Sequence, residues 1–382
     1  LYLTQSNHVK GLTKREYEAL RETCRYAKNL YNVGLYSIRQ YVFAEGRFLC
    51  CESTYQAVKA NANDALLQAG VSQQILKVVD RAFRSFFTLL KNAKQGEYRF
   101  RDVRIPHYRD KNAYFPLILS TNAIVIKDGY LLVLMSREFQ RLHPDLERIK
   151  ILFPSRLEGK AVKEVRILPR EKARFSNVQF VYEAEEEPQP HLSADKALAM
   201  DLGLDNLATC VNSTDGSSFI LDGKHLKSIN QQYNLRMAKL QSMLDQQRLP
   251  RSEQMARITM HRNNQVRDYM RKSARYIVDY CVNHESGAIV AGYNPAWKHD
   301  VKLGKRNNQN FAQIPHGQLR NQVKNLCERY GIQYLEQEES YTSKASFLDH
   351  DPIPCWDATR QDHAFRGQRV KRGCTATATT VC

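Results

Sequence analysis

Acidic residues follow two apolar runs in the second half of the chain. Asp201 comes directly after the run at 197–200, and Glu338 and Glu339 come after the run at 332–336. Carboxylates at the ends of neighbouring strands can hold hard cations such as Mg²⁺, although one or two carboxylates alone bind them weakly. Two such cations about 3.5–4 Å apart can activate water and stabilise a leaving oxygen. A complete site of this kind needs at least three carboxylates.

Both acidic positions also have a simpler interpretation. Asp201 could be a polar residue of the turn that ends a strand, although Gly203 leaves room there for close approach of backbone or phosphate. Glu338 and Glu339 could be an exposed acidic pair before a turn. The sequence favours a site at Asp201 and leaves the role of the two glutamates open.

The pattern of apolar residues divides the part of the chain before this site into two regions. Residues 11–110 read as helical, with Thr13 opening a capping box and an apolar stripe running over 71–90. Residues 113–187 read as short strands, and Asp-Gly at 128–129 between two β-prone runs is typical of a hairpin. Several short strands with turn signals predict a small barrel or sandwich.

A third region follows an acidic, proline-bearing linker at 185–190, which is the clearest domain boundary in the sequence. The run at 197–200 and two hairpin-like runs after it predict three antiparallel strands. Helices and strands then alternate, with predicted elements at 226–284 (a helical stretch interrupted near Pro250), 288–291, 318–330 and 332–336. This order is expected of an RNase H-like domain.

Composition points to a folded protein with a polyanionic partner. The net charge is +17 and the pI is near 9.4, and basic side chains gain affinity by releasing counterions from phosphates. A generally basic protein without such a partner is the alternative. No apolar run is long enough for a membrane span, and the first residues do not resemble a signal peptide, so we expect a cytoplasmic protein with no membrane partner.

The nine cysteines do not form a metal-binding pattern. No C-x-x-C pair occurs, and the number of cysteines is odd. We therefore expect neither a disulfide framework nor zinc, and interpret most cysteines as small buried residues.

Basic and aromatic residues alternate in one segment, at 98–109. Arginines interleaved with aromatic residues suit phosphate contact together with base stacking, although a solvated loop has a similar composition. The basic face of the helix at 71–90 is a second candidate surface. The predicted nucleic-acid contacts in these two segments are Lys77, Arg81, Arg99, Arg101 and Arg104.

Several motifs together resemble the TnpB family, the transposon-encoded relatives of the type V CRISPR effectors. The run Asp-Leu-Gly-Leu-Asp-Asn at 201–206 resembles the family's first RuvC motif, and the resemblance covers nearly the whole chain. The other matching segments lie at 70–74, 120–124, 262–264 with Asp268, 307–311 and 338–344. Through these motifs the resemblance adds Arg262, Asn308 and Lys344 to the predicted nucleic-acid contacts.

The family resemblance implies an α/β multidomain fold with three parts. These are a helical recognition domain at 11–110, a wedge-like β-barrel formed by 1–10 and 111–190, and a C-terminally truncated RuvC-like domain at 191–382. It also implies a guide RNA, which pairs with double-stranded DNA beside a short flanking motif. We expect the protein itself to be a monomer in the prokaryotic cytosol or nucleoid.

The sequence departs from the family at two acidic positions. The strand at 289–294 lacks the glutamate with which typical members end their fourth strand, and Glu338 or Glu339 on the next strand could replace it. The family's Asp-x-Asn segment is replaced by a low-complexity tail at 374–382 without a carboxylate side chain, which resembles a truncation or frame change. Four aspartates before it, interpreted as loop residues, are Asp349, Asp351, Asp357 and Asp362.

These departures predict a vestigial catalytic site of Asp201, Glu338 and Glu339, with Mg²⁺ at Asp201 weakly held or lost. Base pairing can direct binding without cleavage, so the sequence favours a nuclease-dead, RNA-guided DNA-binding protein that represses transcription by occupying its target. One alternative is an active RNA-guided DNA endonuclease with a rearranged RuvC site. The other is a decayed transposon protein that only binds RNA.

Overall fold

The structure is a computed structural model, and it divides into two compact units, Leu1–Glu185 and Glu186–Cys382. It describes residues 1–189, 191–293, 313–342, 345, 350–354 and 363–366, together with the backbone of two strands at 368–371 and 374–376. Within these ranges, no helix combines the length and the apolar character that crossing a membrane requires.

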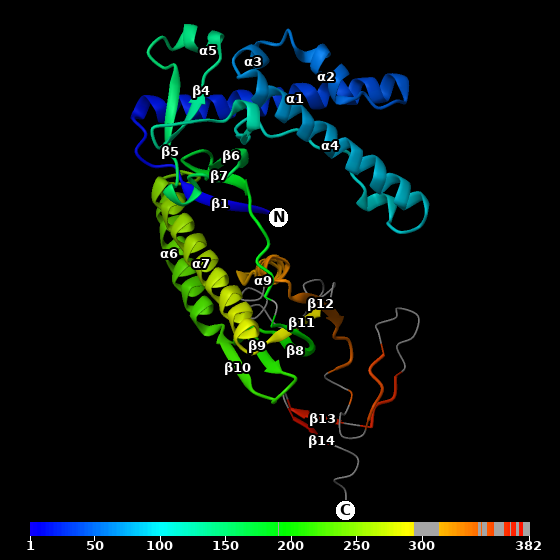
Figure 1. The fold of residues 1–382 in the computed structure, drawn as a ribbon. Helices are drawn as coiled ribbons and strands as arrows, with labels where there is room; N and C mark the ends of the chain where they lie inside the picture. Colours follow the sequence, from blue (N-terminus) through cyan, green and yellow to red (C-terminus); the bar gives the residue numbers. More distant parts are fainter. Residues whose placement is uncertain are drawn as a thin grey trace, which may run out of the picture. The chain divides into compact units, whose positions relative to one another are not determined.

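Helices make up the first half of unit 1 (Figure 1). They are α1 (Lys14–Glu45), α2 (Cys51–Val58), α3 (Ala62–Ala65) and α4 (Ala69–Lys94), followed by the short 3₁₀ turn η1 (Phe100–Asp102). The predicted capping box is confirmed at α1, where the Thr13 Oγ1 accepts from the Glu16 N–H at 3.2 Å and the Glu16 carboxylate accepts from the Thr13 N–H at 2.8 Å. This exchange satisfies two backbone donors that the helix itself cannot.

A glycine allows α1 and α4 to approach closely. A Cβ built on Gly34 of α1 would lie 2.6 Å from Leu76 Cδ2 of α4, so a larger residue would require the buried Leu76 side chain to shift. The stripe of α4 predicted from its apolar spacing is buried, with Ile75, Val79 and Phe83 each 0% exposed. The predicted apolar stripe of this helix is thus confirmed, because its 3.6-residue periodicity is strong.

The remaining elements of unit 1 are strands and short helical turns. They are β1 (Tyr2–His8), β2 (Leu117–Ser120), η2 (Thr121–Ala123), β3 (Val125–Lys127), β4 (Tyr130–Leu134), α5 (Arg137–Leu142), β5 (Arg148–Leu152), η3 (Ser155–Leu157), β6 (Val162–Arg170) and β7 (Phe175–Glu183). The predicted hairpin is confirmed, since β3 and β4 pair antiparallel around Asp128 (φ 52°) and Gly129 (φ 76°). Positive φ at both central residues is the turn geometry for which Asp-Gly is suited.

The predicted wedge-like barrel is not closed in the part of the chain that the structure describes. The strands form two open sheets, one of order β1-β7-β6-β2 and one of order β3-β4-β5. A closed barrel requires every strand to have a neighbour on both sides, whereas β1 and β2 end the larger sheet. Alternating hydrophobicity predicted the strands but could not distinguish an open sheet from a closed one.

One hydrophobic core runs through the helices and both sheets of unit 1. It includes Leu20 of α1, Phe83 of α4, Leu131 of β4 and Phe180 of β7, all at most 1% exposed. Helical and β regions of residues 1–185 therefore stabilise one another by shared burial. The finer division into recognition and wedge domains stays a prediction.

Unit 2 contains a five-stranded sheet of order β10-β9-β8-β11-β12. Its strands are β8 (Ser193–Leu202), β9 (Asn206–Asn212), β10 (Ser218–Asp222), β11 (Ser286–Tyr293) and β12 (Gln333–Glu338). The first three pair antiparallel, as predicted, and β11 pairs parallel with both β8 and β12. The carboxyl ends of β8, β11 and β12 therefore meet at one edge of the sheet.

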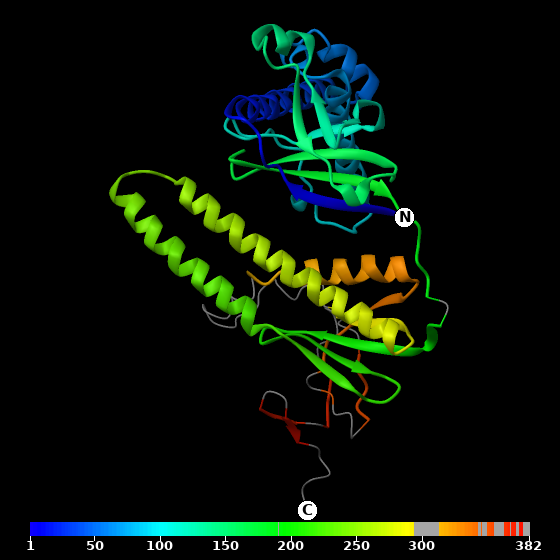
Figure 2. The ribbon, with the colours of Figure 1, turned by 60° about the vertical axis from the view of Figure 1, so that its left-hand side comes forward.

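The helices among the described residues of unit 2 are α6 (Lys224–Gln246), α7 (Glu253–Asn283) and α9 (His316–Tyr330). Figures 1 and 2 show α6 and α7 as a long antiparallel pair, and Figure 2 shows α7 and α9 over one face of the sheet. Their core residues include Met270, Ile277 and Val323, each 0% exposed. The mixed α/β architecture and the order of elements agree with the sequence prediction.

Part of the predicted low-complexity tail is extended. β13 (Gln368–Lys371) and β14 (Cys374–Ala376) pair antiparallel. Residues 377–382 lie outside the described residues.

Candidate functional site

Asp201 lies near the end of β8, beside the central strand β11. The parallel register of β8 and β11 places Met200 opposite Ala291, so that Asp201 follows at the level of Gly292. On its other side Asp201 pairs with Thr209 of β9. The Asp201 side chain is thus held on the middle of the sheet edge, where strand ends from distant parts of the sequence converge.

Glu339 directly follows β12 and extends its carboxylate over Gly292. A Cβ built on Gly292 would lie 1.5 Å from Glu339 Oε1 and 2.1 Å from Glu339 Cδ, so only glycine leaves this space free. The register of β8 and β11 puts Asp201 at the level of the same glycine. The structure therefore brings Asp201 and Glu339 together above Gly292, and we call these two side chains the carboxylate pair.

Glu338 binds Ser340 in the turn that follows β12. Its Oε1 accepts hydrogen bonds from the Ser340 N–H, at 3.2 Å, and from the Ser340 hydroxyl. Successive side chains of an extended strand point to opposite sides, so only one of two adjacent glutamates can face Asp201. The sequence could not decide between them, and the structure places Glu339 at the pair.

Both carboxyl groups of the pair have raised pKa values. Burial raises the pKa of Glu339, and the Asp201 charge raises it further. Burial also raises the pKa of Asp201, whereas the Leu202 backbone N–H lowers it, even though much of the Asp201 side chain remains exposed. The pair is thus a concentration of negative charge that a proton or a cation would stabilise.

Replacing Glu339 by glutamine is expected to raise the melting temperature of the metal-free chain at neutral pH, by about 1–3 °C. The raised pKa means that the folded state binds the Glu339 proton more tightly than the unfolded state, so stability falls as pH rises through the ordinary carboxyl range to the raised pKa. Glutamine removes this loss. Below a pH of about 4, where the carboxyl is protonated in both states, the gain should disappear.

The control for this substitution is Glu338→Gln, which removes an adjacent carboxylate that binds Ser340 instead. Thermal unfolding of both variants over a pH series separates the two positions. Equal melting temperatures for the two variants at neutral pH would contradict the assignment of Glu339 to the carboxylate pair.

The turn after Asp201 is fixed by two close contacts. A Cβ on Gly203 would lie 2.7 Å from the Asn206 carbonyl oxygen, so this position requires glycine. The Gly203 carbonyl oxygen lies 2.8 Å from Nε2 of His316, a residue that is 2% exposed at the start of α9. His316 is a positioning residue for this turn that the sequence analysis missed, because no local pattern connects positions 203 and 316.

A third acidic ligand does not join the pair within the described ranges. No group of three or more His, Cys, Asp or Glu residues suited to a metal ion occurs among the residues with defined positions. Asp351 accepts a hydrogen bond from the Arg366 N–H at 3.0 Å. Asp349, Asp357 and Asp362 lie outside the described residues.

Comparison with known proteins gives two informative matches. Residues 179–297, under half of the chain, match the model of the OrfB_IS605 family, which is described as a probable transposase. The Cas12f1–sgRNA–target DNA complex solved by cryo-EM has a TM-score of 0.58 at 12% identity, over 87% of this chain and 75% of that one. The second half of the chain is thus similar to a transposase family, and the fold is similar to that of a Cas12f1 effector.

Other solved structures match with lower scores. The mini RNA-guided endonuclease CRISPR-Cas phi3 has a TM-score of 0.46 at 9% identity, over 99% of this chain and 90% of that one. C2c1 from Alicyclobacillus acidoterrestris in complex with single-guide RNA has a TM-score of 0.36 at 7% identity, over 90% of this chain and 63% of that one. A search of the curated proteins finds no match.

Five of the predicted basic contacts lie on two surfaces of unit 1. Lys77 and Arg81 are exposed and one turn apart on α4. Arg99, Arg101 and Arg104 are exposed in and after η1, where Arg99 pairs with Asp102 at 2.9 Å. Their contact with nucleic acid stays a prediction. Asn308 and Lys344 lie outside the described residues.

Arg262 differs from the other predicted contacts because its side chain is directed into unit 2. Its Nε donates to Asn230 Oδ1 at 2.8 Å and its Nη2 donates to the Gln313 carbonyl at 3.1 Å. Its guanidinium also lies 5.5 Å from the ring centroid of Tyr233. Burial lowers the pKa of Arg262. These contacts give it a structural role, and its contact with nucleic acid stays a prediction.

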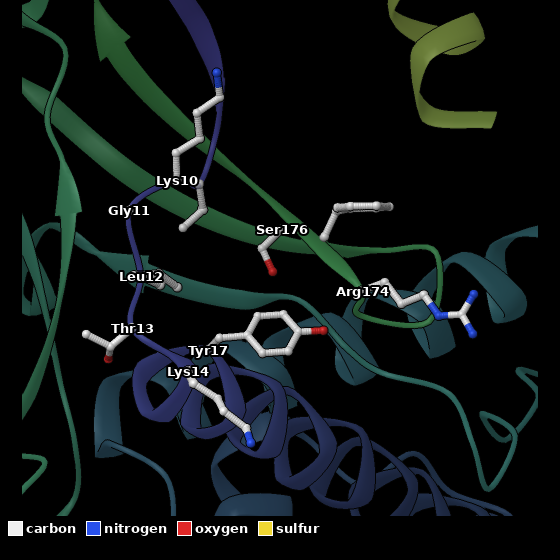
Figure 3. A pocket seen from close by; sticks show the side chains of 10 residues that line it. Lys10, Gly11, Leu12, Thr13, Lys14, Tyr17, Arg174 and Ser176 are labelled. Atoms are coloured by element: carbon white, nitrogen blue, oxygen red, sulfur yellow. The ribbon is translucent and has the colours of Figure 1, made fainter. Parts of the chain in front are cut away.

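A hollow of about 310 Å³ lies where β1 leads into α1 (Figure 3). Its lining includes three cationic residues, but Figure 3 shows the side chains of Lys10, Lys14 and Arg174 leaving the hollow in different directions. The Tyr17 hydroxyl donates to the Ala173 carbonyl at 2.9 Å at its edge. Three diverging cations do not make a convergent anion site.

Proposed function

We propose that the chain is an RNA-guided protein that binds double-stranded DNA beside a short flanking motif and occupies its target without cutting it. Two facts support guided binding: the net charge of +17, and the similarity of the fold to a protein solved with a single-guide RNA and target DNA. In such systems base pairing reads the sequence, while the protein holds the heteroduplex in a basic channel. A bound promoter is then blocked to polymerase, which makes the protein a transcriptional repressor.

The proposal that the protein does not cleave DNA is based on the small number of carboxylates at the site. Its members among the described residues are Asp201 and Glu339. Two carboxylates alone hold Mg²⁺ weakly, and a two-metal site needs more of them. Binding needs no such site, so it survives where cleavage is lost.

Mg²⁺ nevertheless fits the carboxylate pair. Burial raises the pKa of both carboxyl groups, and the Asp201 charge raises that of Glu339 further, so a cation would stabilise their charged forms. Asp201 and Glu339 are the residues that would hold the ion. When bound, it would supply Lewis-acid activation of water at a phosphodiester. Gly292 leaves the space that the Glu339 carboxylate would need to hold the ion together with Asp201.

A second candidate function is RNA-guided cleavage at a rearranged RuvC site. The observation in its favour is the convergence of Asp201 with Glu339, a glutamate supplied by β12 instead of the end of β11. In that case the third ligand comes from residues outside the described ranges. If the protein cleaves its target, Mg²⁺ and a matched plasmid should give a linear product. If it only occupies the target, the plasmid should stay intact.

The deciding experiment uses the full chain purified with its co-expressed RNA. The complex is incubated with Mg²⁺ and a plasmid that carries the sequence matching the guide beside randomised flanking bases. We expect the plasmid to be bound and to stay supercoiled, and a reporter promoter that carries the target to be repressed. A linear product from the plasmid with the matched target would contradict binding without cleavage and support the nuclease function.

Asp201→Ala is the control variant for this reaction. If the protein only occupies its target, wild type and variant should bind, repress and fail to cut equally. If the site is active, the variant should lose cutting and keep binding. Co-purified RNA without a variable guide region would instead support the third reading, a decayed transposon protein that only binds RNA.

A further inference from the structure

One exposed face of α1 combines two aromatic side chains with an arginine. Tyr36, Arg39 and Phe43 are spaced three and four residues apart, which places them on one side of the helix. Tyr36 is 55% exposed and Phe43 is 67% exposed. The side of α1 that packs in the core carries Leu35 and Ile38, which are each 0% exposed. The aromatic rings are therefore not part of the packing of unit 1.

The segment before β2 is held along the same face by hydrogen bonds from side chains of α1 to its backbone. The Asn32 side-chain amide donates to the Arg109 carbonyl at 2.9 Å, and its oxygen accepts from the Arg109 N–H at 2.8 Å. Lys28 of α1 donates to the Lys111 carbonyl at 3.1 Å. Two consecutive clamps of this kind hold the chain around residue 109 against the helix, so Tyr108 has a fixed position.

Tyr108 and Phe43 both contact the same arginine. The Arg39 guanidinium carbon lies 4.9 Å from the ring centroid of Tyr108 and 5.9 Å from that of Phe43. Tyr108 is itself 42% exposed. Contact with two rings restricts the Arg39 guanidinium before any ligand binds. This restriction lowers the entropy cost of stacking a planar ligand on it.

We propose that Tyr36, Arg39, Phe43 and Tyr108 form a stacking platform for unpaired nucleotides of RNA. The adjoining segment 98–111 carries five basic and two acidic residues, so the surroundings complement a phosphate backbone. Exposed rings and guanidinium planes stack on bases that are free of a duplex, because every base has a π-face. This inference deepens the proposed function, since a guide RNA is the unpaired nucleic acid which that function requires.

Unpaired RNA fits the platform better than duplex DNA does. The bases of a duplex are already stacked on one another and turn only their edges outward. The rings of Tyr36 and Phe43 would then meet phosphates and remain without an apolar partner. The platform thus predicts discrimination by strandedness, which phosphate contacts alone do not provide.

The test measures binding of the full chain to a fluorescent oligouridine RNA of about twelve nucleotides, and to duplex DNA of the same length. The double variant Phe43→Ala/Tyr108→Ala should bind the RNA about tenfold more weakly and the duplex within about twofold of wild type. The slope of log affinity against log salt should be unchanged, because stacking releases no counterions. A single-stranded DNA of the same length distinguishes RNA from unpaired nucleic acid in general.

Three control variants make the result specific. Tyr2→Ala removes a tyrosine that is 64% exposed on β1 and should leave RNA affinity unchanged. Arg39→Lys keeps the charge but loses the planar stack, and should weaken RNA binding while preserving the salt slope. Arg99→Ala/Arg101→Ala should instead lower the slope.

The stacking platform would be contradicted if the double variant bound RNA as tightly as wild type. It would also be contradicted if the affinities for RNA and for duplex DNA fell equally. A change in self-association of the double variant by size exclusion without a change in RNA binding would contradict it as well, since the rings would then serve a protein contact. The oligouridine carries no guide sequence. Failure of guided DNA targeting therefore does not affect this test, and failure of the platform does not affect the targeting reaction.

Discussion

Gly292→Ala is expected to weaken binding of a divalent cation by about ten- to a hundredfold while leaving the chain folded. The added Cβ would lie 1.5 Å from Glu339 Oε1, so the Glu339 side chain must leave its place beside Asp201. The three nearest atoms to that Cβ all belong to the flexible end of Glu339, which can move without shifting the sheet. Titration with Mn²⁺ followed by electron paramagnetic resonance measures the change.

The two controls for Gly292→Ala are Gly317→Ala and Glu339→Gln. A Cβ on Gly317 of α9 meets nothing within 4 Å, so this glycine substitution should leave cation affinity unchanged. Glu339→Gln should weaken binding as much as Gly292→Ala does. The two changes combined should cost no more than either alone, because both act through the same carboxylate. Additive losses would show that Gly292 acts by another route.

Arg262→Ala is expected to lower the free energy of unfolding of unit 2 by about 2–3 kcal/mol. Arg262 donates to Asn230, which is 1% exposed, and to the Gln313 carbonyl, so the substitution leaves buried acceptors without their donor. Arg262→Lys should recover only part of the loss, because an ammonium cannot reproduce the planar fork over Tyr233. Urea denaturation followed by circular dichroism measures both variants.

The matched control is Arg257→Ala on the same helix. Arg257 pairs with Glu253 in an exposed salt bridge, and such a pair contributes at most about 0.5 kcal/mol. If Arg262 acts through nucleic acid instead, Arg262→Ala should leave stability as it is and weaken RNA or DNA binding. Stability loss with unchanged nucleic-acid affinity is the outcome that the structure predicts.

Local patterns predicted the secondary structure well and the assembly of strands less well. The hairpin at Asp128 and Gly129 and the capping box at Thr13 are confirmed, because each depends on the conformation of a few adjacent residues. Closure of the predicted barrel depends on whether β1 and β2 find further neighbours, which no local pattern encodes. Strand type is a local property, whereas sheet closure is a property of the whole unit.

The candidate site shows the same division between local and distant information. Asp201 was predicted because an apolar run, an aspartate and a nearby glycine stand together in the sequence. The choice of Glu339 over Glu338 required the orientation of two adjacent side chains at the end of β12, which sequence spacing does not fix. Gly292 and His316 were missed because their roles exist only through residues far away in the chain.

The stacking platform was missed for a different reason. The spacing of Tyr36, Arg39 and Phe43 is visible in the sequence, but aromatic residues on a helix usually belong to the core. Only their exposure, together with Tyr108 arriving from another segment, separates them from the buried stripe of the same helix.

The central place of β11 in the five-stranded sheet has a consequence for synthesis of the chain. Since β11 lies between β8 and β12, the ribosome must extend the protein past residue 293 before β8 acquires its inner neighbour. Until then β8 is a sheet edge with unpaired backbone groups and the apolar side chains of Leu198 and Met200, a feature that invites aggregation. Nascent chains of this protein therefore pass through a long interval in which they benefit from chaperone protection.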